Sequence, residues 1–291
     1  MRVGRIPYIN CYPVYGAIDR GLVSLDGTLV NGVPSALNAQ MANGTLDISV
    51  VSAVEYARDS HRYLLLPDLA ISCDGPVHSV MLFSHRPASE LSGRRVIVSR
   101  SSMTSVALLE LLFEHVWRVR PEFVPGDAEI ADIARFGDDP HVARLVIGDA
   151  ALRIGGVATE GAAAADVVGM RSSKDVSYRH QYDLGTEWKA WTGLPFVFAV
   201  WVAQRTTPVA DALRTHSSLM ASRDWGLAHL PELAHQASLA AGVGEETCVA
   251  YLSGLDYGLS YPHLAGLTEF YRRLVAAGRV PNGTLSFLPA A

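Results

Sequence analysis

Hydrophobic positions along the chain alternate between short, dense apolar runs and longer stretches in which apolar residues recur every three or four positions. The short runs are typical of buried strands, and the longer spacing is typical of helices that bury one face. Strands are predicted within residues 2–9, 46–59, 61–73, 77–85, 94–99, 122–127, 143–153 and 194–205. The alternation of strands with helices predicts the α/β fold class.

Helices are expected between these strands and over most of the C-terminal part. They are predicted at residues 11–21, 34–44, 103–117, 129–138 and, almost throughout, 207–279. The first two end at Gly21 and Gly44, and glycine is the preferred residue just after a helix. Residues 182–193 are assigned to a long loop, and residues 279–291 to a loose tail.

The order of these elements predicts two lobes. One α/β unit opens the chain, a second is inserted, and the chain then returns to the first. We expect lobe 1 to contain residues 1–90 and 200–291, with the C-terminal helices, and lobe 2 to contain residues 91–199. Two such lobes form a clamshell that binds ligands in its cleft, at strand ends and helix starts. The relevant strand-to-helix turns are residues 8–11, 51–55, 99–105 and 148–150.

The composition indicates a folded protein with little affinity for polyanions. Of the 291 residues, 49% are hydrophobic and 18% are charged, which is ample for a large core. The net charge is −5 and Lys and Arg do not cluster, which argues against nucleic acid or an anionic membrane as a partner. The chain opens without a signal segment and has no apolar run of about 18 residues, so we expect a cytoplasmic location.

The sequence motifs give no reason to expect a cofactor or a metal. Cys11, Cys73 and Cys248 lie far apart, with neither metal nor disulfide spacing. The "GVGEE" segment around Gly242 does not have the dinucleotide-binding pattern, and the chain has neither a phosphate-binding loop nor a Ser-His-Asp elbow. We therefore expect a cofactor-independent protein with a small-molecule ligand, and the oligomeric state stays open.

The segment "SRSSMTSVALLELL" at residues 99–112 places many hydroxyl groups directly before an apolar helix. One Ser or Thr there can cap the helix by accepting from a backbone N–H group that lacks an intrahelical partner. This segment offers five hydroxyls, on Ser99, Ser101, Ser102, Thr104 and Ser105. Together with the positive end of the helix dipole, they favour an anion site, with a plain cap as the alternative.

Six motifs resemble those of a known enzyme family in sequence and order. They are "GRIPYINCYPVY", "LDISVVSAVEYA", "DGPVHSVMLFS", "SSMTSVALLELL", "LVIGDAAL" and "YDLGTEWKAWTGLPFVFAVW". On these motifs the chain resembles the chorismate dehydratases of the futalosine route to menaquinone. The resemblance implies the type II periplasmic-binding-protein fold, used here for catalysis. It also implies a carbon–oxygen lyase (hydro-lyase) that converts chorismate to 3-[(1-carboxyvinyl)oxy]benzoate and water without a cofactor.

The resemblance also gives the turn residues roles toward this dianionic substrate. Asn10, Ser52 and Glu55 are the expected catalytic residues. The expected substrate-binding residues are Tyr8, Ser101, Ser102, Met103, Thr104, Ser105, Gly148, Asp149 and Phe196. Several have structural alternatives: Asn10 is a common turn residue, and Ser52 and Asp149 can cap helices. Glu55 can be a helix-start acid or, with a pKa raised beside the dianion, a base.

Three questions stay open at this point. The proton can pass to a protein residue or to one of the substrate's own carboxylates. His78, on a crossing segment, and the aromatic cluster around Trp188 and Trp201 are expected to be mainly structural, with the "WTGLPF" turn at the rim of the cleft. The alternative functions are the related 1,4-dihydroxy-6-naphthoate synthase, whose opening motif this chain lacks, and a non-catalytic protein that binds small carboxylates.

Overall fold

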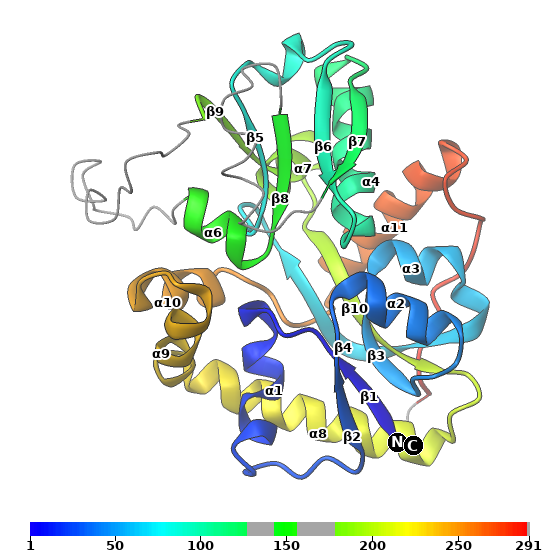
Figure 1. Cartoon of the computed structure of the whole chain (residues 1–291). Coiled ribbons are helices and arrows are strands. Elements are labelled where there is room, and N and C mark those ends of the chain that lie inside the picture. Colours follow the sequence, from blue (N-terminus) through cyan, green and yellow to red (C-terminus); the bar gives the residue numbers. More distant parts are fainter. Residues whose placement is uncertain (127–142, 156–177, 290–291) are drawn as a thin grey trace.

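The chain forms two α/β lobes, each built on a five-stranded sheet (Figure 1). The computed structural model describes residues 1–126, 143–155 and 178–289. The strand order is β2-β1-β3-β10-β4 in the first sheet and β7-β6-β8-β5-β9 in the second. The α/β class and the two-lobe arrangement predicted from the sequence are confirmed.

The two sheets repeat one pattern of strand directions. The first contains β1 (Arg2–Arg5), β2 (Thr28–Asn31), β3 (Ile48–Ser52), β4 (Tyr63–Cys73) and β10 (Phe196–Gln204). The second contains β5 (Val80–Ser84), β6 (Arg95–Ser99), β7 (Glu122–Gly126), β8 (Ala143–Ile147) and β9 (His180–Asp183). The three strands on one side of each sheet are parallel, while β10 and β5 run antiparallel to both of their neighbours. Strands β3, β5 and β10 are buried along their whole length, which explains their continuous apolar sequences.

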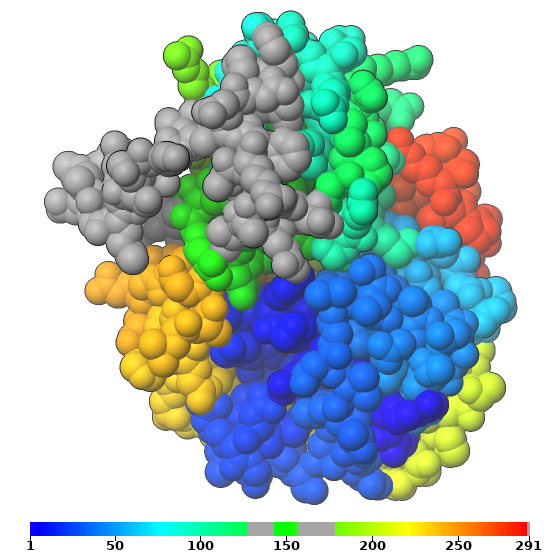
Figure 2. Space-filling model, viewed as in Figure 1, coloured from blue at the N-terminus to red at the C-terminus, as the bar shows by residue number. Residues whose placement is uncertain are grey.

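Helices cover both sheets and fill the C-terminal part of the described chain. They are α1 (Tyr12–Asp19), α2 (Pro34–Ala42), α3 (Ala53–Arg58), α4 (Met103–Leu112), α6 (Asp149–Gly155), α7 (Leu184–Thr192), α8 (Val209–Ala228), α9 (Leu230–Ala241), α10 (Glu245–Ser253) and α11 (Tyr261–Ala276). Helix α8 packs on α1, and α9 contacts both α1 and α6, so the C-terminal helices touch both lobes. In Figure 2 the orange α9–α10 pair lies directly beside the green α6. No helix in the described ranges is long and apolar enough to cross a membrane.

The sheets divide the chain differently from the boundaries expected at residues 90 and 199. Those boundaries place strand β5 in lobe 1, but it lies between β8 and β9 in the second sheet. Strand β10 begins at Phe196 and belongs to the first sheet throughout. The hydrogen-bond partners of both strands are distant in sequence, and local hydrophobic spacing does not identify them.

The prediction of a loop at residues 182–193 is wrong, because most of this segment forms helix α7. Asp183 caps this helix by accepting from the Thr186 N–H at 3.0 Å, and Gly193 ends it with a left-handed φ of 73°. The capping signal is local and was present in the sequence. Helix α7 thus forms part of the second connection between the lobes, from β9 to β10.

The C-terminal tail is also better ordered than expected. Leu65 on the edge strand β4 donates to Ser286 O and accepts from the Leu288 N–H, both at 2.8 Å. The tail therefore covers an edge of the first sheet, which would otherwise expose unpaired backbone groups. The helix predicted at residues 129–138 lies outside the described residues.

Candidate active site

A cleft between the lobes is lined by residues from both sheets. The volume accessible inside it is about 80 Å³. Its lining residues are Ile6, Tyr8, Asn10, Pro34, Ser52, Ile71, Val77, Ser79, Val80, Ser102, Thr104, Ser105, Ile147, Gly148, Phe198 and Ala199. All of these side chains are neutral. The described part of the wall therefore offers hydroxyl groups, one amide and one phenol next to apolar surface.

The start of α4 brings three hydroxyls into the cleft. Ser102 is the N-cap: its Oγ accepts from the Ser105 N–H at 3.3 Å and also contacts Ser105 Oγ at 2.8 Å. Thr104 Oγ1 accepts from the Val54 N–H at 3.1 Å, which joins α4 in one lobe to α3 in the other. The N–H groups of Met103 and Thr104 begin a ten-residue helix and have no intrahelical acceptor. This geometry supports both the cap and the anion site as interpretations of the hydroxyl-rich segment. Ser102 caps the helix, while Thr104 and the positive end of the helix dipole lie at the cleft.

Ser101 and Met103 lie beside the cleft but not among its lining residues. Ser101 pairs with Ser99, since their hydroxyls are 2.9 Å apart and the Ser101 N–H donates to Ser99 Oγ at 3.1 Å. Met103 places its Sδ 3.3 Å from Asn38 Nδ2 on α2 of the other lobe. Both residues therefore make contacts that shape the turn before α4.

Asn10 enters the cleft from the short 3₁₀ turn Ile9–Cys11 that follows β1. The sequence pattern extends the first strand to residue 9, but the strand ends at Arg5, so Ile6 and Tyr8 form part of the wall. Asn10 Oδ1 is buried and has no hydrogen-bond partner among the described residues. An unpaired buried acceptor costs about 1–3 kcal/mol, which a ligand with a suitable donor would recover. Asn10 is thus the clearest candidate for a contact with a ligand.

Ser52 faces the cleft from the end of β3, while Glu55 points elsewhere. Ser52 Oγ caps α3 by accepting from the Glu55 N–H at 3.1 Å. The Glu55 carboxylate accepts from the Tyr63 hydroxyl at 3.3 Å and is not part of the cleft lining. Burial raises the pKa of Glu55, and the nearby Arg58 and the Tyr63 hydroxyl only partly counteract this.

Gly148 and Asp149 form the turn after β8. Gly148 has a left-handed φ of 63°, and a Cβ atom there would lie 3.4 Å from the Tyr8 ring across the cleft. Asp149 starts α6 outside the cleft lining, and its Oδ1 accepts from the Ile9 N–H at 3.4 Å. Burial raises the pKa of Asp149, an effect that this N–H group opposes. The turn thus requires glycine and joins lobe 2 to the segment that carries Asn10.

The aromatic residue at the cleft is Phe198 rather than the expected Phe196. Phe196 is 1% exposed, and its ring lies 5.1 Å from the Trp188 ring and 4.9 Å from the Phe270 ring, measured between centroids. It therefore supports Phe198, whose ring centroid is 4.6 Å away, from within the core.

Ser79 lines the cleft but was not recognised in the sequence. It lies on the first connection between the lobes, and its carbonyl accepts from the Gly148 N–H at 2.8 Å. His78 beside it is held by its backbone, with its N–H 2.6 Å from Asp183 Oδ2. A search for hydroxyl residues on the segments that cross between lobes would have found Ser79. Among the described residues, no three His, Cys, Asp or Glu side chains come together in a way that could hold a metal ion.

Comparison with known proteins assigns the chain that forms this cleft to a family. The family model described as menaquinone biosynthesis matches residues 1–276. The chain belongs to the menaquinone biosynthesis family. A Thermus thermophilus protein named chorismate dehydratase is 31% identical over 274 residues, which cover 92% of this chain and 95% of that protein.

Similar solved structures confirm the fold of this family member. A protein from Archaeoglobus fulgidus has a TM-score of 0.71 at 19% identity, covering 96% of this chain and 98% of its own. The periplasmic aliphatic sulphonate binding protein of Escherichia coli has a TM-score of 0.62 at 12% identity, covering 98% and 94%. The chain therefore has a periplasmic-binding-protein-like fold, as the resemblance in its motifs implied.

Proposed function

We propose that this protein dehydrates chorismate to 3-[(1-carboxyvinyl)oxy]benzoate and water, as a carbon–oxygen lyase. Its family and the chorismate dehydratase of Thermus thermophilus, which spans nearly the whole chain, support this assignment. In the reaction, the ring carbon that bears the enolpyruvyl ether loses a proton, and the neighbouring carbon loses its hydroxyl group. The electron pair left by the proton completes the aromatic ring, which makes the overall step favourable.

The observation that carries the proposal is the unpaired, buried Oδ1 of Asn10 in a cleft lined by hydroxyl groups. Chorismate has a ring hydroxyl that can donate to this oxygen, and carboxylates that can accept from hydroxyl and N–H donors. The start of α4, with Thr104 and the positive end of the helix dipole, suits one carboxylate. Phe198 and Ile71 provide apolar surface for the ring.

Loss of the hydroxyl group requires stabilisation of an oxygen that gains negative charge. Donors fixed in place before the reaction contribute most to such a step, because they need not reorganise as the charge develops. The Asn10 amide and the Ser52 hydroxyl face the same cleft and are the donors that we assign to the departing oxygen. Asn10 Oδ1 orients the ring hydroxyl of the bound substrate by accepting from it, while Nδ2 of the same amide and the Ser52 hydroxyl are already in place to donate to the oxygen as it leaves.

For the proton, we propose one of the substrate's own carboxylates as the acceptor. The departing hydroxide then takes this proton from the carboxyl group and leaves as water, which restores the carboxylate. The described cleft wall consists of neutral hydroxyl, amide and apolar groups, and the Glu55 carboxylate is engaged by Tyr63 outside it. A carboxylate held against the ring by α4 has the proximity that makes an intramolecular transfer efficient. We also propose a cytoplasmic location, since a dianionic substrate does not cross a membrane unaided.

The test is incubation of the purified protein with chorismate, followed by NMR or chromatography for the aromatic product. We expect conversion with release of one water, unchanged after dialysis against a strong chelator. The likeness to a sulphonate binding protein favours one competing function, binding without chemistry. Calorimetry separates the two: tight binding of chorismate with no product would overturn the enzymatic proposal. Activity that is lost on chelation and restored by a single metal ion would contradict the cofactor-independent mechanism.

A further inference from the structure

Asn38 on α2 makes two hydrogen bonds to Ser52 and is 3% exposed. Its Oδ1 accepts from the Ser52 N–H at 3.2 Å, and its Nδ2 donates to Ser52 Oγ at 3.1 Å. Helix α2 packs directly against β3, which ends at Ser52, so this pair joins the helix to the end of the strand (Figure 1). Asn38 does not line the cleft itself.

The surroundings of Asn38 fix the orientation of its amide group. The Ser52 N–H is a donor, so it must meet the amide oxygen. If the amide were turned over, Nδ2 would face this N–H group, and Oδ1 would face Met103 Sδ, which has no proton to donate. The amide nitrogen must therefore point to Ser52 Oγ.

This arrangement determines what the Ser52 hydroxyl can do. A hydroxyl oxygen has two acceptor positions and one proton. Ser52 Oγ accepts from Asn38 Nδ2 and from the Glu55 N–H, so both acceptor positions are occupied. Its proton has no acceptor among the described residues, and Ser52 lines the cleft. The hydroxyl is left as a donor directed at the ligand.

We propose that Asn38 is a positioning residue that makes Ser52 a dedicated hydrogen-bond donor to the substrate oxygen that gains negative charge. The inference rests on the proposed function and concerns a residue that touches no substrate atom. A donor to developing charge acts mainly in the transition state, so loss of its orientation lowers kcat more than it changes KM.

A double-mutant cycle tests whether Asn38 acts through Ser52. We expect Ser52→Ala to lower kcat about 100-fold and Asn38→Ala about tenfold, both with KM changed less than about threefold. In the Ser52→Ala background, Asn38→Ala should lower kcat by less than about twofold, because the hydroxyl that it orients is gone. The control is Asn43→Ala, which removes two hydrogen bonds to Thr45 at the exposed end of the same helix. We expect it to leave kcat unchanged.

Asn38→Asp adds a readout that a purely structural residue would not show. In this variant an ionised carboxylate accepts from both Ser52 groups and turns the hydroxyl proton away from the cleft, which lowers kcat. A protonated carboxyl donates to Ser52 Oγ again, so kcat should recover relative to the wild type as the pH falls, whereas Asn38→Ala should not recover. If Asn38→Ala lowers kcat equally with and without Ser52, the inference is overturned while the proposed function stands. A wild-type protein that makes no product from chorismate would overturn both.

Discussion

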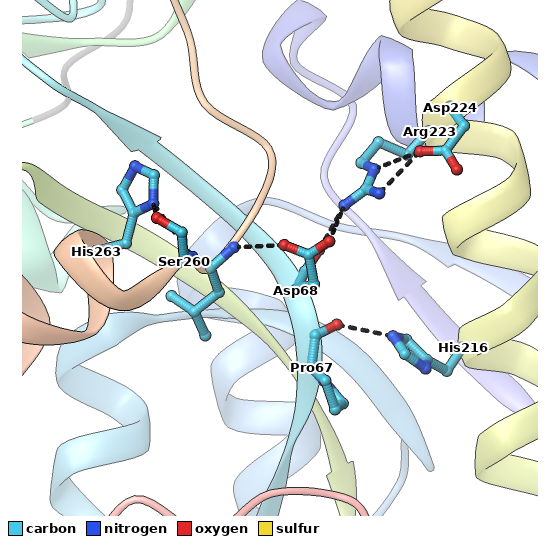
Figure 3. A network of polar contacts seen from close by, with 8 residues as sticks. Pro67, Asp68, His216, Arg223, Asp224, Ser260 and His263 are labelled. Atoms are coloured by element: carbon cyan, nitrogen blue, oxygen red, sulfur yellow. Dashed lines mark hydrogen bonds and ion pairs between the residues drawn. The ribbon is translucent and has the colours of Figure 1, made fainter. Parts of the chain in front are cut away.

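Two polar regions of this protein differ in how completely their groups are paired. One is the cleft between the lobes, and the other is a network around Asp68, on the bulged strand β4 of the first sheet (Figure 3). In the network, the Asp68 carboxylate accepts from the Leu259 N–H at 3.1 Å and from Arg223 Nη1 at 3.3 Å. His216 bonds to the Pro67 carbonyl at 2.8 Å, so α8 is fixed to this bend of the strand.

In the cleft, by contrast, specific polar groups are left without a partner. Asn10 Oδ1 has none among the described residues, and the Ser52 hydroxyl has a proton but no acceptor there. Paired groups hold chain segments in place, whereas unpaired groups at a cavity are available to a ligand. The difference teaches that hydrogen-bonding capacity left unused at a cavity, rather than polarity alone, separates a binding wall from a structural network.

Thr215 shows that an unpaired group must also face a cavity. Its Oγ1 is buried on α8 with no partner in the described structure, next to His216 of the network. It does not line the cleft, so a ligand there cannot reach it. Thr215 therefore provides a natural control for substitutions at the cleft.

The largest effect should come from Asn10→Asp, which places a negative charge beside a dianion and removes the amide donor. We expect kcat to fall about 100-fold, the scale of losing one well-placed donor, and binding to weaken through repulsion. Steady-state kinetics with circular dichroism as a check on folding measures both. A variant within about threefold of the wild type in kcat/KM would make Asn10 a turn residue only.

A substitution in the Asp68 network should lower the stability of the protein and leave its activity unchanged. Asp68→Ala removes one of the two carboxylates that pair with Arg223, the other being Asp224, and leaves a residue without a polar side chain at a left-handed φ of 51°. Because the Asp68 side chain is 55% exposed, solvent screens part of the loss, and we expect about 2 kcal/mol lower stability. Thermal unfolding should show a Tm lower by about 4–6 °C, with kcat and KM unchanged. A large loss of kcat at full folding would contradict the distinction between the two regions.

A matched pair of Thr→Val substitutions sharpens the comparison. Thr104→Val removes a hydroxyl that faces the cleft, and we expect KM to rise about tenfold, equivalent to about 1.4 kcal/mol. Thr215→Val removes an equally buried hydroxyl elsewhere, and we expect unchanged kinetics with equal or higher stability. Equal kinetic effects of the two substitutions would show that their position relative to the cleft does not matter.

The smallest effect is predicted for Glu55→Gln. Burial raises the pKa of Glu55 above its usual value of 4.5, so the folded protein binds this proton more readily than the unfolded chain does. Ionisation at neutral pH therefore lowers stability, and the loss develops as the pH rises above 4.5. We expect Glu55→Gln to raise Tm by about 1–3 °C at pH 7, with no gain near pH 4. Its kcat should stay within about threefold of the wild type, whereas a collapse of kcat would make Glu55 the base.

The sequence by itself determined the local features of this protein. The alternation of apolar spacing indicated which segments are strands and which are helices, because burial on one or both faces imposes those periods. The hydroxyls before α4 were recognisable because a helix start has the same unpaired N–H groups in any protein. The turns that contain Asn10, Ser52 and Gly148 were also recognisable, since each lies where the sequence predicts that a strand passes into a helix, while the roles of these residues came from the resemblance.

Only the tertiary structure decided which of these residues meet. The sheet to which β5 belongs depends on hydrogen bonds to β8 and β9, which lie far away in sequence. The irregular pairing of β10 with β4 between Val197 and Ala199 accompanies the placement of Phe198 at the cleft and Phe196 in the core, which strand alternation alone does not predict. The pairing of Asn38 with Ser52 likewise requires α2 to lie against β3. Such contacts arise from packing between distant segments, so the sequence around each residue does not identify its partner.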